Sequence, residues 1–360
     1  MCVLSGPNGS GKSSLLQALQ FLRTAMLRGV REAVRLTGGG ALLRRLGAEP
    51  KAPVHLELCI GDLRWEIQIP VEGGSVHPKP DEVIEHGGKV LARRAMYSDE
   101  VFLGDKQRWA DERSVLRMLW DAHNPQEILP LVELVRGIRV YSSYCLDEIR
   151  EPQLYTDDVY LNPSGKNAWS VLSNWRGAPR KYGDQFRWVV HALQRAFPDL
   201  VEDLELDIEG RTVGGRFYPP TARSADDSLP LNLAADGLLV GILHLTAIAG
   251  AKAGSIVAID EMENQLHPHA IRSILDSMRE MAESRDLTVL LTTHSPVVMN
   301  TFKGLEDQFY VLEAGHDVLP VPLDEVLDPD WLAHFSSLGS LYDREEFAAP
   351  VHAAPATETE

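Results

Sequence analysis

The residues best suited to chemistry form one run near the start of the chain. This run consists of Gly6, Pro7, Asn8, Gly9, Ser10, Gly11, Lys12 and Ser13, it is followed by Ser14, and it has the pattern G-x-x-x-x-G-K-[ST]. Glycines in such a loop let backbone N–H groups turn towards phosphate oxygens. Lys12 would reach the β- and γ-phosphates, and Ser13 would offer its hydroxyl to Mg²⁺. An apolar run precedes the loop and an amphipathic helix pattern follows it, so we expect these nine residues to bind a nucleotide.

A pair of carboxylates follows a second apolar run at 255–259. Asp260 and Glu261 end this predicted strand. Mg²⁺ prefers hard oxygen ligands and keeps several waters, so one carboxylate at a strand tip suffices to hold it. Asp260 would hold the ion, and Glu261 would orient and deprotonate an attacking water. Such a pair alone is more often an acidic turn, so the assignment of a metal-binding and catalytic role depends on the flanking residues.

Those flanking residues carry a family resemblance. Residues 259–268 are I-D-E-M-E-N-Q-L-H-P, and residues 290–296 are L-L-T-T-H-S-P. With the phosphate loop, these segments resemble the RecF/SMC-like branch of ABC ATPases. They resemble more closely the stand-alone bacterial AAA/ABC-type ATPases related to the ATPase domain of OLD-family nucleases. The resemblance runs from residue 6 to about 347 and includes weaker segments at 160–168 and 338–342.

The resemblance implies ATP and Mg²⁺ as ligands and hydrolysis of ATP to ADP and phosphate. His294 matches the switch histidine that hydrogen-bonds the γ-phosphate, although a strand-end histidine satisfied by backbone is the alternative. Residues 263–267 match the loop at the dimer interface. Such ATPases trap two ATP molecules between two heads, which implies a homodimer or a higher homo-oligomer.

The segment expected to act across that dimer departs from the family pattern. Instead of a form such as L-S-x-G-x-x-R, the chain has Leu233, Ala234, Ala235, Asp236 and Gly237. Gly237 is retained, but Ala235 replaces the serine and the arginine is absent. Losing one positioned donor costs about 10²–10³ in rate, so slow hydrolysis, or hydrolysis used as a timer, is expected. Gln153 is the candidate for the family's Q-loop glutamine. Only five residues precede Gly6, which leaves base recognition open.

These patterns predict an α/β fold: an ABC-type P-loop NTPase head with a mixed or parallel sheet, antiparallel β hairpins and an α-rich insertion. Residues 1–71 and 201–347 would form the head, 72–200 a mainly helical insertion, and 348–360 a disordered tail. Hairpins are expected at 54–71 and 204–218, strands at 138–144, 287–292 and 308–312, and helices at 268–284 and within 100–135. The longest apolar run, 238–251, is too short to span a membrane, contains His244, and predicts a buried helix.

The charge pattern bears on partners. The net charge of −17 disfavours a wholly basic nucleic-acid binder. A local basic stretch offers non-specific DNA contacts, with a solvated helix face as the equal alternative; it contains Arg28, Arg31, Arg35, Arg44 and Arg45. Three distant cysteines and no visible targeting segment favour the cytoplasm and no membrane association.

Two further function classes remain beside the enzyme. No nuclease constellation is apparent in the sequence, so a separate nuclease-like effector is expected, in anti-phage defence or DNA repair. The first alternative is a nucleotide-gated scaffold that binds ATP and a partner with negligible hydrolysis, which the Ala235 departure favours. The second is the ATPase subunit of a membrane transporter, which the long insertion argues against.

Overall fold

The computed structural model describes residues 1–39, 43, 49, 52–72, 75–76, 79–123, 125–313, 319–332 and 334–348. The chain forms two compact units. Unit 1 comprises Met1–Ser13 and Arg139–Glu360, and unit 2 comprises Ser14–Ile138. These boundaries differ from the expected ones at 71/72 and 200/201. Arg44, Arg45 and the predicted tail from residue 349 onward lie outside the described residues.

Unit 1 is built on a six-stranded sheet with the strand order β10-β15-β16-β1-β17-β18. All neighbours are parallel except β17 and β18, which are antiparallel. The central strands β1, β15 and β16 contain no charged residue, as is typical of strands that are buried on both faces. The predicted strands are confirmed as β1 (Cys2–Ser5), β10 (Arg139–Tyr141), β15 (Ile256–Ile259), β16 (Thr288–Thr293) and β17 (Phe309–Val311). The edge strand β18 (Val321–Pro322) was not predicted.

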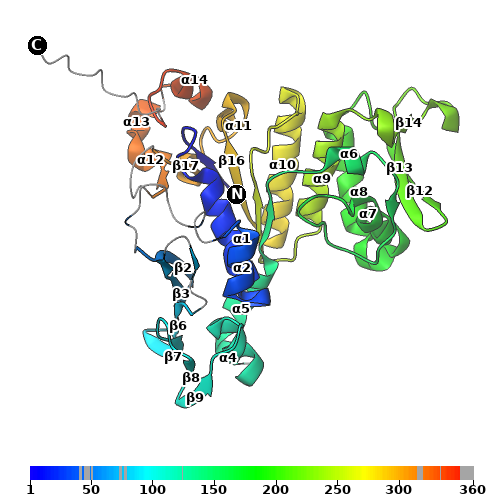
Figure 1. The fold of residues 1–360 in the computed structure, drawn as a ribbon. Helices are drawn as coiled ribbons and strands as arrows, with labels where there is room; N and C mark the ends of the chain where they lie inside the picture. Colours follow the sequence, from blue (N-terminus) through cyan, green and yellow to red (C-terminus); the bar gives the residue numbers. More distant parts are fainter. Residues whose placement is uncertain are drawn as a thin grey trace, which may run out of the picture. The chain divides into compact units, whose positions relative to one another are not determined.

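Helices pack beside this sheet (Figure 1). Helix α9 (Asp236–Ala249) is buried from Leu238 to Ala249, as expected of a helix that is apolar on all sides. Helix α10 (Pro268–Arg285) begins with a proline at its first turn, where the missing N–H costs nothing. The remaining helices of unit 1 are α6 (Leu146–Ile149), α7 (Ala168–Gly177), α8 (Pro179–Ala196), α11 (Pro296–Asn300), α12 (Leu323–Val326), α13 (Pro329–Leu332) and α14 (Leu338–Asp343).

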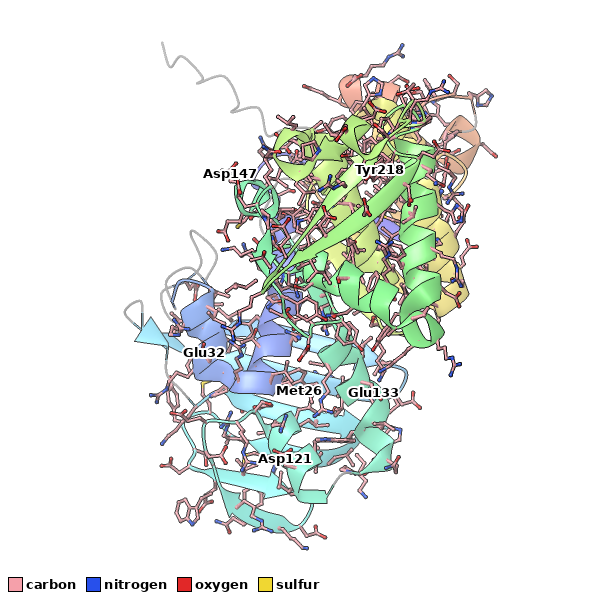
Figure 2. The ribbon with its side chains drawn as sticks, turned by 90° about the vertical axis from the view of Figure 1, so that its right-hand side faces the viewer. Met26, Glu32, Asp121, Glu133, Asp147 and Tyr218 are labelled. Atoms are coloured by element: carbon pink, nitrogen blue, oxygen red, sulfur yellow. The ribbon has the colours of Figure 1, made fainter. Side chains whose placement is uncertain are left out.

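A smaller antiparallel sheet completes unit 1. The predicted second hairpin is confirmed as β12 (Asp203–Glu209) and β13 (Thr212–Tyr218), and Tyr218 marks it in Figure 2. Strands β11 (Gln153–Leu154) and β14 (Leu229–Pro230) pair with β13. Short 3-10 turns flank β14 at Ala225–Asp227 and Leu231–Leu233, and another at Glu306–Gln308 precedes β17 of the large sheet.

Unit 2 is a six-stranded antiparallel sheet with helices packed on it, marked in Figure 2 by Met26 and Glu133. Alternate residues of β3 are buried, among them Trp65 and Ile67, so one face of the strand forms the core. The elements are α1 (Lys12–Arg28), α2 (Val30–Leu36), β2 (Val54–Ile60), β3 (Leu63–Ile69), β4 (Val71–Glu72), β5 (Ser75–Val76), β6 (Asp81–His86), β7 (Lys89–Arg94), β8 (Glu100–Leu103), β9 (Lys106–Trp109), α4 (Val115–His123), a 3-10 turn (Gln126–Ile128) and α5 (Leu129–Gly137).

The expectation of a mainly helical segment from residue 72 needs correction. The first hairpin, β2–β3, is present, but β3 pairs with β6, and the sheet continues through β7, β8 and β9. The helix expected from residue 100 therefore starts only at Val115. A buried ion pair joins Glu82 to Arg94 at 3.1 Å. The Glu82 carboxylate also accepts a hydrogen bond from the backbone N–H of Leu116 in α4.

Among the helices that the structure describes, none has both the length and the apolar character needed to cross a membrane.

Candidate nucleotide site

Four neighbouring strands of the large sheet end at one edge, and each leads into a segment with polar residues. Because β10, β15, β16 and β1 are parallel and adjacent, the residues that follow them are brought together. These segments begin at Ser142, Asp260, His294 and Gly6. In open α/β sheets, the crevice beyond the carboxyl ends of the strands is the usual place for a ligand.

The phosphate loop follows β1 and is tightly constrained. A Cβ atom on Gly6 would lie 2.2 Å from the carbonyl oxygen of Leu312, so only glycine fits there. Gly9 and Gly11 have φ of +79° and +104°, in the left-handed region that glycine tolerates. Pro7 is buried, whereas Asn8 is exposed; Ser14 is exposed on α1. The Ser10 hydroxyl is buried with no hydrogen-bond partner among the described residues.

Lys12 is the buried cation of this loop. Its Nζ donates to the carbonyl oxygens of Gly6 at 2.7 Å and Pro7 at 3.0 Å. Burial lowers the pKa of Lys12, and the negative charges of Asp260 and Glu261 act in the opposite direction. A preorganised ammonium group can exchange such carbonyl contacts for phosphate oxygens, which carry full charge.

Asp260 forms hydrogen bonds with the phosphate loop and with the neighbouring strands β16 and β10. Its Oδ1 accepts hydrogen bonds from Ser13 Oγ at 3.2 Å and from Thr292 Oγ1 at 2.5 Å. The backbone N–H of Asp260 donates to the carbonyl oxygen of Tyr141 at 2.9 Å. Ser13 and Asp260 are 247 residues apart in the chain, and they offer a hydroxyl and a carboxylate, the hard oxygen ligands that suit Mg²⁺.

Glu261 lies at the mouth of a neighbouring pocket. Its φ is +47°, unusual for a residue with a side chain, and its Oε2 accepts a hydrogen bond from Asn264 Nδ2 at 2.9 Å. The pocket has a volume of about 170 Å³, and Ser142, Tyr144 and Gln265 also line it. An exposed carboxylate beside such a pocket has room to hold a water.

His294 is oriented by two neighbouring elements. Its backbone N–H donates to Glu263 Oε1 at 2.8 Å, and its Nδ1 lies 3.3 Å from the hydroxyl of Tyr342. Burial, followed by the positive charge of Lys12, lowers the pKa of His294, so the ring is neutral at neutral pH. Burial also raises the pKa of Glu263, whose Oε2 has no partner among the described residues.

Tyr342 is a site residue that the sequence interpretation did not assign. It lies in α14, within the weak segment 338–342. A Cβ on Gly339 would come within 2.5 Å of Pro296 Cβ, so α14 approaches α11 closely at this glycine. The signal was therefore present in the sequence as G-S-L-Y, but its meaning depends on the packing of two short helices.

The predicted signature residues lie at the start of α9. Ala235 precedes the helix and gives it no side-chain cap, and the side chain of Asp236 pairs with Arg150. A Cβ on Gly237 would lie 2.6 Å from the carbonyl oxygen of Gln265. Gln153 lies in β11, donates to the carbonyl oxygen of Glu148 at 3.2 Å, and is not among the residues that line the pocket beside Glu261.

The predicted DNA-contacting arginines lie in unit 2. Arg28 ends α1, and Arg31 and Arg35 lie on α2. Arg35 makes two hydrogen bonds with Glu32, at 2.7 and 2.8 Å, and Arg31 lies 3.9 Å from Glu112. These acids neutralise part of the positive charge that a phosphate backbone would meet.

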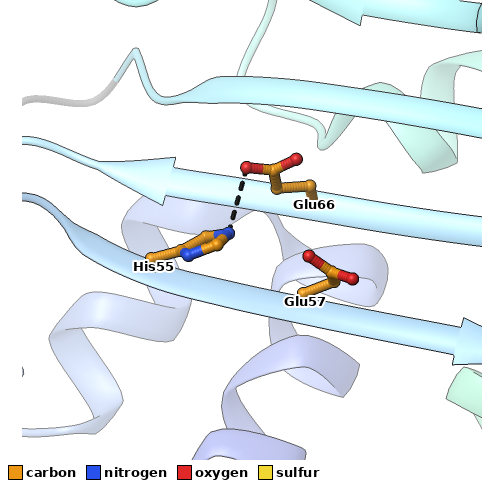
Figure 3. A group of neighbouring side chains, drawn as sticks. All are labelled: His55, Glu57 and Glu66. Atoms are coloured by element: carbon orange, nitrogen blue, oxygen red, sulfur yellow. Dashed lines mark ion pairs between the residues drawn. The ribbon is translucent and has the colours of Figure 1, made fainter. Parts of the chain in front are cut away.

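A second cluster of titratable side chains lies on the hairpin of unit 2 (Figure 3). His55 and Glu57 belong to β2, and Glu66 to β3; the distance from His55 Nε2 to Glu66 Oε1 is 3.0 Å. The guanidinium of Arg64 lies 3.0 Å from Glu57 and 2.6 Å from Glu66. Because a cation of the protein already pairs with both carboxylates, the cluster is an ion-pair network.

Comparison with known proteins agrees with this geometry. The family described as "AAA domain, putative AbiEii toxin, Type IV TA system" matches residues 1–150 and 170–300, and the chain belongs to this family. None of the curated proteins compared with the chain matches it.

One solved structure of an SMC head supports the fold assignment, and two others are similar with lower scores. An SMC head bound to the C-winged helix domain of ScpA is similar with a TM-score of 0.52 and 13% identity, over 90% of this chain and 91% of that chain. An SMC head from Thermotoga maritima has a TM-score of 0.39 and 12% identity, over 89% of each chain. An Smc head with an extended coiled coil, bound to the C-terminal domain of ScpA derived from Pyrococcus furiosus, has a TM-score of 0.49 and 10% identity, over 90% of each chain. The chain is thus a member of an AAA-domain family with the fold of an ABC-type ATPase head.

Proposed function

We propose that this chain binds ATP with Mg²⁺ and hydrolyses it to ADP and phosphate. The observation that carries the proposal is the convergence of Ser13 and Thr292 on Asp260, beside the buried ammonium of Lys12. A buried cation in a glycine loop suits a polyphosphate, and the clustered oxygens suit the ion that accompanies it.

Each side chain then has a role that its position supports. Lys12 binds the β- and γ-phosphates, and the amides of the loop surround them. Ser13 and Asp260 hold Mg²⁺, which neutralises charge on the phosphate oxygens when bound. Glu261 orients the attacking water and takes its proton, and neutral His294 donates a hydrogen bond from Nε2 to the γ-phosphate.

The assembly is part of the proposal. Two copies would close around two ATP molecules, with Ala235, Asp236 and Gly237 of one copy facing the nucleotide of the other. The N-terminus of α9 supports this, because its free N–H groups favour an anion. A use in defence against phage or in repair, with a separate nuclease-like effector, is proposed from the sequence resemblance; the family description itself names a putative toxin and a type IV TA system. Arg28, Arg31 and Arg35 are the proposed non-specific DNA contacts.

The test is ATP turnover per subunit over a range of protein concentrations, with Glu261→Gln as the control. Glu261→Gln keeps the size of the side chain and removes the base, so we expect turnover to fall by at least about 100-fold while ATP still binds. A rise in turnover per subunit with concentration supports the two-copy site. Turnover that survives in Glu261→Gln would rule out this base and with it the proposed mechanism.

The start of α9 favours the scaffold alternative. Helix α9 begins at a residue without a side-chain hydroxyl or amide, because Ala235 is its cap. ATP binding with no turnover above that of Glu261→Gln would identify the isolated chain as a nucleotide-gated scaffold.

A further inference from the structure

Helix α9 contacts the segment 261–266, which follows the carboxylate pair, at two points. Gly237 and His244 are seven residues apart, about two turns, and so lie on the same side of the helix. Gly237 packs against the carbonyl oxygen of Gln265, where a Cβ would lie at 2.6 Å. The Nε2 atom of His244 is 3.1 Å from the carbonyl oxygen of Met262. One helix face therefore touches both halves of the segment that carries Glu261.

His244 is held in a single tautomer by its partners. A carbonyl oxygen can only accept, so Nε2 carries the proton and donates it to Met262. The Nδ1 atom then accepts a hydrogen bond from the hydroxyl of Tyr144 at 3.1 Å. His244 is 3% exposed, and its burial lowers its pKa to about 4, so the ring stays neutral. Apart from Thr246, His244 is the only polar side chain among the buried residues 238–249 of α9, and both of its ring nitrogens have partners.

The segment that His244 contacts is conformationally unusual. Glu261 and Gln265 both have positive φ, at +47° and +65°, and both carry side chains. Residues other than glycine rarely adopt this conformation and keep it only where the surroundings impose it. The two contacts with α9 fall on Met262, next to Glu261, and on Gln265 itself. The helix is placed to maintain these two positions.

The segment 160–168 packs against Tyr144, whose hydroxyl donates to His244. Gly165 has a φ of +77°, and a Cβ there would lie 3.1 Å from Cδ1 of Tyr144 and 2.9 Å from Leu243 of α9. The turn containing Gly165 therefore packs closely against both. This gives the G-K-N part of that segment a structural role beside the site.

We propose that His244 is a positioning residue for Glu261: by donating from Nε2 to the Met262 carbonyl oxygen, it holds the backbone on which the base is mounted, and so couples the placement of α9 to catalysis. The inference rests on the proposed function, because it assigns Glu261 as the base. It concerns kcat rather than ATP affinity, since His244 and Tyr144 make no hydrogen bond to residues 6–13 within the described chain.

The experiment compares His244→Phe, His244→Gln and Thr246→Val in the full chain. Phenylalanine keeps a ring but removes the donor, whereas the glutamine amide can still donate to Met262. Thr246 is buried in the same helix, and its hydroxyl has no partner among the described residues, so Thr246→Val controls for a change of polarity in α9. Four quantities are measured: kcat for ATP with Mg²⁺, KM for ATP, amide hydrogen exchange of 261–266 without nucleotide, and the melting temperature.

We expect His244→Phe to lower kcat by about 10- to 100-fold, because a misplacement of about 1 Å can cost that much. KM should change by less than about twofold, and exchange of 261–266 should become faster. His244→Gln should recover most of the kcat and of the protection, and Thr246→Val should match the wild type. If His244→Phe does not fold, Tyr144→Phe takes its place. This variant removes only the hydroxyl that donates to His244 Nδ1, and it should lower kcat and speed up exchange by smaller amounts.

The outcomes separate this inference from the proposed function. Unchanged kcat in His244→Phe, with turnover still abolished by Glu261→Gln, overturns the positioning role and leaves the ATPase intact. An equal loss of kcat in His244→Phe and His244→Gln also overturns it, because the donor is then irrelevant. If the wild type shows no turnover above that of Glu261→Gln, the proposed hydrolysis fails. Hydrogen exchange then tests the positioning role by itself, and unaltered exchange of 261–266 in His244→Phe overturns that role.

Discussion

Among single residues, Gly6 shows how space as well as conformation constrains the phosphate loop. Its hypothetical Cβ would lie 2.2 Å from the Leu312 carbonyl oxygen, and that carbonyl belongs to backbone that continues from β17. A rotamer change cannot relieve this clash, because the atom that the Cβ would meet belongs to the backbone.

Gly6→Ala should therefore displace the loop and separate Lys12 from its position. We expect ATP binding to weaken by at least about tenfold and the free energy of unfolding to fall by about 1–3 kcal/mol, as for other overpacked sites. Titration with a fluorescent ATP analogue and denaturant unfolding measure the two effects.

Gly177→Ala is the matched control for that substitution. Gly177 ends α7, and a Cβ there meets no heavy atom within 4 Å. Alanine in a helix is favoured over glycine by up to about 1 kcal/mol, so this variant should bind ATP normally and be equally or slightly more stable. Normal binding by Gly6→Ala would contradict the steric argument.

At the scale of elements, α9 should make the fold sensitive to acid. The pKa of His244 is lowered by burial from 6.5 to about 4, so the unfolded chain takes up a proton at a pH where the folded chain does not. Stability is then present above pH 6.5 and is lost as the pH falls towards 4. A difference of that size corresponds to about 3 kcal/mol.

Urea unfolding of the wild type and of His244→Gln at several pH values between 7 and 5 measures this effect. Tyr144, Asp260 and Glu261 line the same pocket as His244 and are present in both proteins. The wild type should lose stability on acidification faster than the variant. Parallel curves would show that His244 does not contribute.

Elements were predictable where one strong signal determined them. Strands β15 and β16 and helix α10 follow from apolar runs bounded by recognisable segments. Strands β8 and β9 were missed, because Glu100 and Lys106 give the region the composition of a charged helix. Only Val101 and Leu103 of β8 face the core, and strand pairing with β7 and β9 determines the conformation.

The candidate site was predictable to the same degree. The pairing of Ser13 with Asp260 follows from two segments whose chemistry requires them to meet. The contacts of Tyr342 with His294 and of Tyr144 with His244 do not follow, because they depend on how α14 and the segment after β10 pack. The segment 338–342 that contains Tyr342 was noted in the sequence, but the sequence assigned neither tyrosine its contact with a histidine.

For the whole molecule, the proposed closure of two copies can be tested on an exposed residue. Leu233 precedes the signature residues and is 68% exposed. Gly237 is less suitable for this purpose, since any Cβ there would clash within its own subunit. A charge at Leu233 should leave the subunit folded and able to bind ATP.

We expect Glu261→Gln with ATP and Mg²⁺ to form dimers, because ATP that is not hydrolysed keeps the two heads closed. Adding Leu233→Glu should abolish the dimer, since an unpaired carboxylate would be buried beside the partner's phosphates. Ile208→Glu is the control, because Ile208 is also exposed, at 60%. Its neighbours Asp207 and Glu209 line a groove together with Leu231 and Asn232. Successive side chains of a strand point to opposite faces, so Ile208 points away from that groove. Sedimentation velocity distinguishes the states. Dimers that persist in the Leu233→Glu variant would place the contact between copies elsewhere on the molecule.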